Sequence, residues 1–95
     1  MSVRLEYIAP STWGTKKWMS VFSDGHIVHF GNPNYSDYTM HKDITRRNAY
    51  IRRHINEAHL WQDVPYSPSA LSRWILWEKP NMRDAIISYK NRFNL

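Results

Sequence analysis

The sequence predicts an α+β fold, in which a small antiparallel sheet, made of an N-terminal strand and a hairpin, packs against about three helices. Two observations indicate this class. Strand-like segments fill the first third of the chain and helix-like segments follow, and strands and helices do not alternate as a parallel sheet would require. A chain of 95 residues has room for one domain, residues 1–95, and for no second core.

Three strands are expected in the sheet. From Val3 to Ile8, apolar residues alternate with polar ones, a pattern typical of a half-buried strand, and Pro10 ends it. The second and third strands, 18–22 and 26–30, flank an Asp-Gly pair. Because glycine accepts the positive φ that tight turns require, this pair predicts a hairpin.

The first helix is expected to follow a break in the chain. Residues 31–34 are rich in turn formers, and residues 35–40 are expected to form an ordered loop or a short extended piece. Asp43 is placed to cap a helix that continues to about Ile55, with Thr45 as the alternative cap.

Two further helices follow an expected loop over 56–66. Ser67 and Pro68 provide a capping hydroxyl and a first-turn proline for a helix that runs to about Trp77. This helix is apolar on nearly every side, which predicts that it is the centre of the core. Asn81 caps the last helix, whose apolar stripe is expected to pack on the core.

Aromatic side chains are expected to provide much of the core. The chain has five Trp, six Tyr and three Phe, and each of these buries a large area. Trp74 and Trp77 are expected inside the core, while Trp13 and Trp61 are expected to cover it, with a role as interface anchors as the alternative. The chain contains no cysteine, which excludes disulfides and a thiolate zinc site.

The charge balance indicates an anionic partner. Thirteen Lys and Arg against eight Asp and Glu give a formal net charge of +5, which favours nucleic acid, acidic protein surfaces or anionic lipid. The N-terminus lacks the apolar segment of a signal peptide, and the longest apolar run, Trp74 to Trp77, is too short to cross a bilayer. We therefore expect a protein inside the cell, without a membrane partner.

The first expected helix concentrates the basic charge. On a helical wheel, Ile44, Ile51 and Ile55 cluster with Asn48 as the expected core face. Cationic and aromatic side chains occupy the adjoining arc and the residues just before the helix: His41, Lys42, Arg46, Arg47, Tyr50, Arg53 and His54. Because guanidinium groups match phosphate and carboxylate oxygens bidentately, we expect these residues to bind an anion on a face that points away from the interior. An ordinary solvated helix face is the alternative.

The sequence indicates neither a catalytic site nor a metal or cofactor site. His41, Lys42 and Asp43 are adjacent and lack the spacers of the phospholipase D signature, and no histidine pair has a nearby carboxylate cluster. A Gly-rich phosphate loop and a nucleophile elbow are also missing. We therefore expect no catalytic residue, no cofactor, no metal and no small-molecule substrate.

Several motifs follow one another in a distinctive order: Lys17-Trp18-Met19-Ser20-Val21-Phe22, His29-Phe30-Gly31, Tyr35 to Asp43, Arg46-Arg47 with Tyr50, Arg53-His54, Trp61, Leu71 to Trp77, Tyr89-Lys90 and Arg92-Phe93. From about Lys16 to Phe93, the chain resembles a family of small basic proteins of unassigned function that large eukaryotic DNA viruses and some bacteriophages encode. The resemblance implies a viral setting. It implies no activity and no catalytic residue.

Three functions follow from these expectations. The leading hypothesis is a non-enzymatic viral structural protein, a minor capsid or virion-associated component that binds an acidic capsid-protein surface or nucleic acid. The alternative is a nucleic-acid-binding protein that acts outside the particle through phosphate contacts. The second alternative is a small metal-independent nuclease that uses His, Arg and Tyr. The expected location is the virion or the interior of the infected host cell.

Overall fold

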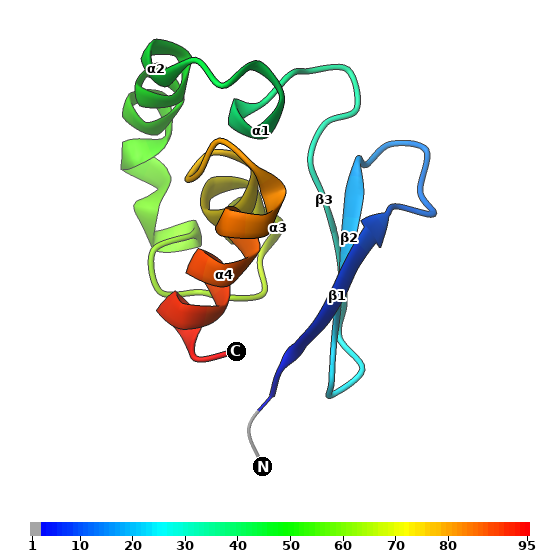
Figure 1. Cartoon of the computed structure of the whole chain (residues 1–95). Helices are drawn as coiled ribbons and strands as arrows, with labels where there is room; N and C mark the ends of the chain where they lie inside the picture. Colours follow the sequence, from blue (N-terminus) through cyan, green and yellow to red (C-terminus); the bar gives the residue numbers. More distant parts are fainter. Residues whose placement is uncertain (1–2) are drawn as a thin grey trace.

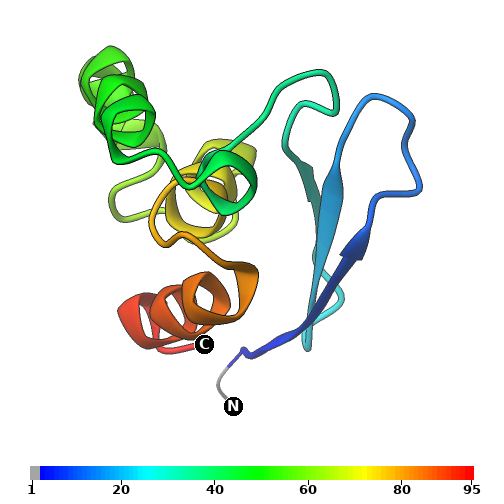
Figure 2. The same cartoon turned by 45° about the horizontal axis from the view of Figure 1, so that its top comes forward.

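A three-stranded antiparallel sheet and a layer of helices form the fold (Figure 1). The computed structural model describes residues 3–95. The strands β1 (Leu5–Pro10), β2 (Trp18–Phe22) and β3 (Ile27–Phe30) lie in the order in which they follow along the chain. Figures 1 and 2 both place the helices on one side of this sheet. The α+β class is therefore confirmed.

The turn between β2 and β3 is the expected hairpin. Gly25 has a φ of 95° and donates its N–H to the Phe22 carbonyl at 3.0 Å. The N–H of His26 donates to Asp24 Oδ1 at 3.0 Å, so the aspartate side chain holds the turn closed. The Asp-Gly signal therefore predicts this turn correctly.

Strand β1 begins later than its sequence pattern suggests, and it contains a bulge. The pairing with β2 shifts between Leu5 and Tyr7, so one extra residue enters β1 at this point. As a result Leu5 is 3% exposed, whereas Tyr7, expected on the same face, is 54% exposed. Ile8 packs against the core in its place. Alternation read from the sequence assumes an unbroken register, and the bulge breaks it.

Two helices and a 3-10 segment follow the sheet. The short helix α1 (Tyr38–His41) lies where an ordered loop or a short extended piece was expected, and Asp37 caps it by accepting the N–H of Thr39. Helix α2 (Ile44–His54) is capped by Asp43, as predicted. It continues into a 3-10 segment, η1 (Ile55–Leu60), in a region expected to be a loop.

The predicted central helix is present, with a change of pitch. It begins as α3 (Pro68–Leu71) and continues as a π-helical turn, η2 (Ser72–Leu76). Ser67 Oγ accepts the N–H of Ala70 at 2.9 Å and so caps α3. The last helix, α4 (Met82–Phe93), has the predicted Asn81 cap. Among residues 3–95, no helix combines the length and the apolar character needed to span a bilayer.

The core lies between the sheet and the helical layer. Its buried side chains come from the strands, from the end of η1, from α3 and η2, and from α4: Leu5, Phe22, Phe30, Trp61, Ala70, Leu71, Trp74, Ile75, Leu76, Ala85 and Tyr89. Trp74 Nε1 donates to the Trp61 carbonyl at 2.7 Å, which satisfies its buried polar atom. The α3–η2 segment is therefore the centre of the core, as predicted.

The tryptophans outside the central helix divide into two kinds. Trp61 is buried and donates its Nε1–H to the His54 carbonyl, so it covers the core as expected. Trp13 differs, because it is 55% exposed and stacks on the ring of His29 at a centroid distance of 3.7 Å. The expectation that Trp13 covers the core is therefore wrong.

Candidate functional site

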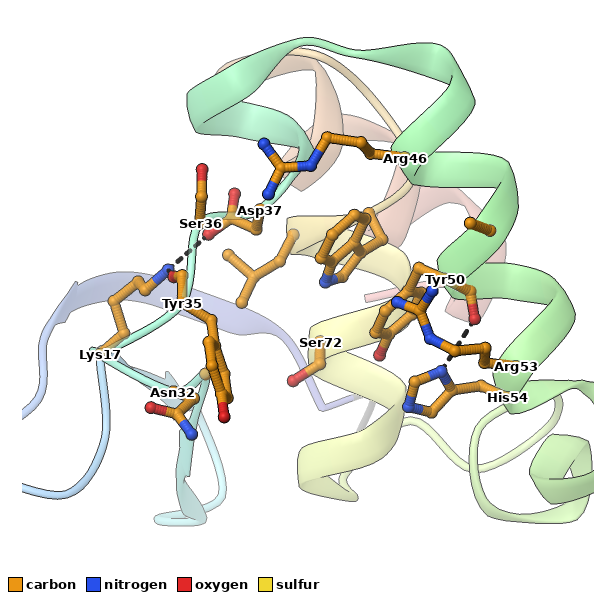
Figure 3. Close-up of a pocket in the computed structure, with 14 residues that line it drawn as sticks. Lys17, Asn32, Tyr35, Ser36, Asp37, Arg46, Tyr50, Arg53, His54 and Ser72 are labelled. Carbon is orange, nitrogen blue, oxygen red and sulfur yellow. Dashed lines mark hydrogen bonds and ion pairs between the residues drawn. The ribbon is translucent and has the colours of Figure 1, made fainter.

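A cavity of about 540 Å³ lies between α2 and the segment that joins β3 to α1 (Figure 3). Its lining combines cationic, aromatic and small polar side chains with a few apolar ones: Lys17, Gly31, Asn32, Tyr35, Ser36, Asp37, Arg46, Ala49, Tyr50, Arg53, His54, Ser72, Leu76 and Trp77. Four of the seven residues predicted from the sequence, Arg46, Tyr50, Arg53 and His54, lie in this lining. His41, Lys42 and Arg47 do not.

A buried ion pair fixes the wall opposite α2. Lys17 Nζ lies 2.7 Å from Asp37 Oδ2, and it also donates to the Tyr35 carbonyl at 2.8 Å. Asp37 caps α1 as well, so one carboxylate joins the loop before β2 to the start of that helix. The pair therefore holds the backbone of Tyr35 in place at the edge of the cavity.

Gly31 forms the corner where β3 enters this wall. Its φ is 85°, a conformation that residues with a side chain rarely adopt. A Cβ at this position would lie 3.0 Å from Leu76 Cδ1 and 3.1 Å from Lys17 Cβ. Both the backbone angle and the close packing therefore require glycine here.

Tyr35 is an exposed aromatic residue on an ordered backbone. Its side chain is 70% exposed, yet its N–H donates to the Asn32 carbonyl at 3.2 Å and its own carbonyl accepts from Lys17. Figure 3 shows the Tyr35 ring on one side of the cavity, with Tyr50 and His54 on the other. An open aromatic face is thus held at the edge of the cavity.

The α2 wall is built on a stack of three aromatic rings. Tyr50 is parallel to Trp77, with an interplanar angle of 3° and a centroid distance of 4.3 Å, and His54 stacks on Tyr50 at 4.0 Å. His54 Nδ1 donates to the Tyr50 carbonyl at 2.8 Å, which fixes the tautomer of the neutral ring. Burial raises the pKa of Tyr50 to about 12. Trp77, expected inside the core, thus packs at the core edge and lines the cavity.

The face of α2 that contacts the protein differs from the expected one. Ile44 and Ile55 are 52% and 53% exposed, and only Ile51 of the three isoleucines is half-buried. Arg47 and Tyr50 turn toward the end of the central helix instead. The prediction of one open ridge is therefore wrong: its residues adjoin one another on α2, but part of that arc faces inward.

Arg47 is neutralised inside the protein. Its Nη2 lies 2.5 Å from Glu78 Oε1, and its Nε donates to the Glu78 carbonyl at 3.2 Å. Arg73 Nη1 lies 3.5 Å from the same carboxylate, while its guanidinium stacks on Trp74. Arg47 Nη1 also donates to Asn48 Oδ1 at 3.2 Å. Because these contacts are all internal, Arg47 connects α2 to the segment that follows η2.

Lys42 and His41 hold the junction between α1 and α2. Lys42 adopts a left-handed conformation, with a φ of 58°, and its Nζ donates to the carbonyls of Thr39 and Pro80. His41 Nδ1 accepts the N–H of Asp43 at 2.9 Å, and its Nε2 is buried. These two predicted binding residues therefore connect elements of the fold.

Acidification is expected to destabilise this junction. Burial, and secondly the charge of Arg46, lower the pKa of His41 below its ordinary 6.5. The unfolded chain thus binds the His41 proton more readily, so the stability that neutral His41 contributes is complete above pH 6.5 and is lost as the pH falls through the lower folded value. Protonation also turns Nδ1 into a donor that opposes the Asp43 N–H.

The measurement is the urea midpoint of unfolding from about pH 7.5 to about pH 5, for the wild-type protein and for His41→Gln. The other histidines are the same in both proteins, so the difference between the two curves isolates His41. We expect the wild-type midpoint to fall more steeply with acid. Parallel curves would contradict the role given to His41.

Arg46 and Arg53 are the free cations of the cavity. Both are exposed, and within residues 3–95 neither guanidinium has a hydrogen bond or an ion pair. Figure 3 shows the Arg46 side chain extending from α2 toward Asp37 and Ser36, and the Arg53 side chain beside Tyr50 and His54. Since Lys17 and Asp37 neutralise one another, these two arginines carry the uncompensated positive charge of the lining.

Between residues 3 and 95, no group of three or more His, Cys, Asp or Glu side chains is arranged to hold a metal ion. His26 Nδ1 is instead bonded to Asp24, and His29 Nδ1 to Ser11 Oγ.

Sequence reasoning missed the wall opposite α2. Residues 35–40 were expected to form an ordered loop or a short extended piece, and Lys17 was not among the predicted site residues. Its contribution depends on an ion pair with Asp37, twenty residues later in the chain. A contact between residues so far apart cannot be predicted from a local sequence pattern.

Comparison with known proteins gives one family match. A family model described as a family of unknown function (DUF5754) matches residues 7–54, about half of the chain. The matched segment runs from β1 to the end of α2 and so contains both walls of the cavity, whereas Ser72, Leu76 and Trp77 lie outside it. Searches of the curated proteins and of the solved structures found no match.

Proposed function

We propose a nucleic-acid-binding function for this chain, which belongs to the family of unknown function DUF5754. In this proposal the protein is not an enzyme, and the cavity beside α2 is its binding site. One observation supports the proposal: the guanidinium groups of Arg46 and Arg53, which have no hydrogen bond or ion pair within residues 3–95, line a cavity together with aromatic rings.

The spacing of the two arginines suits a chain of phosphates. Arg46 and Arg53 lie two helical turns apart, about 10 Å along the axis of α2, and on the same side of it. A guanidinium group binds phosphate oxygens through two parallel hydrogen bonds. Two such groups on one helix side therefore suit neighbouring phosphates of one strand better than a single small anion.

The aromatic lining favours nucleic acid over an acidic protein surface. Carboxylates would pair with Arg46 and Arg53 equally well, but they would make no use of Tyr35, Tyr50 and Trp77. Every nucleobase has a flat face that stacks on aromatic rings. The acidic protein surface expected from the sequence thus accounts for only part of the lining.

The chemistry of the cavity favours binding without catalysis. His54 is the one histidine of the lining, and histidine is the side chain that enzymes use most often as a general acid or base. The partner in its stack, Tyr50, has a pKa raised to about 12 by burial, which makes it a weak proton donor at pH 7. Within residues 3–95, no hydrogen bond joins His54 to the Ser72 hydroxyl. A nuclease would need a second group of matched pKa.

We also propose a viral setting, which rests on the order of motifs from Lys16 to Phe93 and not on the cavity. In that setting the protein is a minor component of the virion, where it contacts packaged nucleic acid, or it acts in the interior of the infected cell. Mass spectrometry of purified particles tests this: the protein's presence supports the virion role, and its absence leaves the role outside the particle.

Replacing Arg46 or Arg53 by alanine is expected to weaken binding to a single-stranded oligonucleotide by about tenfold, because each loses a charge-assisted phosphate contact. Arg52→Ala is the matched control: it removes the same charge from an exposed position of α2 outside the cavity. We expect it to bind nearly as tightly as wild type. The measurement is fluorescence anisotropy at fixed salt, with melting curves to confirm folding.

Three outcomes of this titration would contradict the proposal. Equal losses in all three variants would mean that the binding follows net charge and not the cavity. Tight binding to poly-glutamate with none to oligonucleotides would make an acidic protein surface the partner. Cleavage of the labelled oligonucleotide, lost in His54→Ala, would make the protein a nuclease.

A further inference from the structure

We infer that the cavity admits one unstacked base of a single strand, which the ring of Tyr35 contacts, and that the protein therefore prefers single strands to duplexes. This inference rests on the proposed function, because Arg46 and Arg53 hold the phosphates on either side of the base.

The size and lining of the cavity fit a base. Its volume of about 540 Å³ lies in the range of sites that bind small organic molecules. Tyr50, Trp77 and Leu76 provide flat and apolar surface, while Asn32 and the nearby serines provide hydrogen-bonding groups for base edges. Flat apolar walls with a few polar groups match a heterocyclic ring.

Tyr35 is arranged as a stacking platform. Its backbone is held by the Asn32 carbonyl and by the Lys17 ammonium group, and that ammonium group is itself paired with buried Asp37. An exposed aromatic side chain on a fixed backbone loses little conformational entropy when a ligand stacks on it. A buried ion pair thus positions the backbone of Tyr35, although the Tyr35 ring itself is 70% exposed.

The opposite wall is equally rigid. Tyr50 is held between Trp77 and His54 in a continuous stack, and the His54 ring is fixed by its bond to the Tyr50 carbonyl. These rings are therefore ordered before any ligand arrives. A base on Tyr35 would face this wall across the cavity (Figure 3).

The concave shape explains the preference for single strands. In a duplex each base is paired and stacked, so extruding one from the helix requires breaking its base pair and its stacking contacts. In a single strand this cost is much smaller, so base stacking on aromatic side chains adds directly to phosphate binding. Phosphate binding and base stacking therefore contribute together only when the strand is unpaired.

The test compares two single-stranded DNA oligonucleotides of equal length, one of thymidines and one of abasic sites, so that the phosphates match and only the bases differ. Fluorescence anisotropy gives the Kd of each, and that of a duplex of the same length. We expect the thymidine strand to bind about tenfold more tightly than the abasic strand, and more tightly than the duplex.

Tyr35→Ala should remove most of that difference, by weakening thymidine binding about tenfold while leaving the abasic strand unchanged. Tyr35→Phe should retain it, because the ring remains. Tyr7→Ala is the matched control, since Tyr7 is also an exposed tyrosine but lies on β1, outside the cavity. Because Tyr35 is so exposed, the variants are expected to fold, which circular dichroism verifies.

The outcomes separate the two proposals. If both strands bind equally and Tyr35→Ala changes neither, base insertion is wrong while phosphate binding stands. If the duplex binds as tightly as the thymidine strand, the single-strand preference is wrong. If no oligonucleotide binds, the proposed function itself fails.

Discussion

Replacing Trp74 by alanine is expected to lower the free energy of unfolding by about 3–5 kcal/mol, the range for large-to-small changes in a core. Trp74 lies in η2, at the centre of the core, and its Nε1–H is bonded to the Trp61 carbonyl. The guanidinium groups of Arg73 and Arg92 cover its ring at 4.3 and 3.7 Å. The substitution thus removes apolar contacts, a hydrogen bond and two cation–π contacts together.

Urea denaturation measures this loss, and Trp13→Ala is the control, because Trp13 has the same ring in an exposed position. Trp13→Ala should lower the free energy of unfolding by well under half as much as Trp74→Ala, since the Trp13 ring contacts chiefly His29. Equal losses at the two positions would contradict the assignment of Trp74 to the centre of the core.

Replacing Asp37 by alanine is expected to lower the free energy of unfolding by about 3 kcal/mol, the lower end of the range for breaking a buried ion pair. The change leaves the Lys17 ammonium group without its carboxylate and removes the cap of α1. Lys17 retains some exposure, and water there reduces the penalty. Asp43→Ala removes only an exposed cap of α2, so it should cost about 1 kcal/mol.

A double variant separates the two contributions of Asp37. In Lys17→Met/Asp37→Ala no charge is left unpaired. The loss in the free energy of unfolding should therefore be smaller than in Asp37→Ala and close to the loss from removing the α1 cap alone. Unfolding in urea gives the coupling energy of the cycle. Additive losses would mean that Lys17 and Asp37 do not act as a pair, and that Tyr35 is not held as described.

Local signals in the sequence were sufficient for much of the fold. The Asp-Gly turn, and the caps at Asp43, Ser67 and Asn81, each depend on residues within a few positions of one another, and each is present in the structure. The apolar α3–η2 segment also occupies the expected place. Short-range hydrogen bonds and composition decide these features, so they are visible without tertiary information.

Features that depend on distant partners were not predictable. The apolar pattern of α2 pointed to its isoleucines, but the helix docks by stacking Tyr50 on Trp77 and pairing Arg47 with Glu78, thirty-one residues away in the sequence. Periodicity counts apolar side chains, and it has no means of recognising an aromatic or charged contact face.

The same limit applies to the site. The basic residues adjoin one another on α2 as predicted, but they do not all face outward. Arg47 pairs with Glu78, while Arg46 and Arg53 have no hydrogen bond or ion pair within residues 3–95. The opposing wall was found only in the structure, since Lys17 and Asp37 meet through the fold. The sequence thus indicated four of the lining residues, all on α2: Arg46, Tyr50, Arg53 and His54.

The most direct test of the account is the salt dependence of binding to a single-stranded oligonucleotide, for wild type and for Arg46→Ala/Arg53→Ala. Each phosphate contact contributes about 0.7 to the slope of log affinity against log salt. If both arginines bind phosphates, the double variant should have a slope shallower by about 1.4. A slope equal to that of the wild-type protein would contradict the claim that these two side chains form the nucleic-acid-binding site.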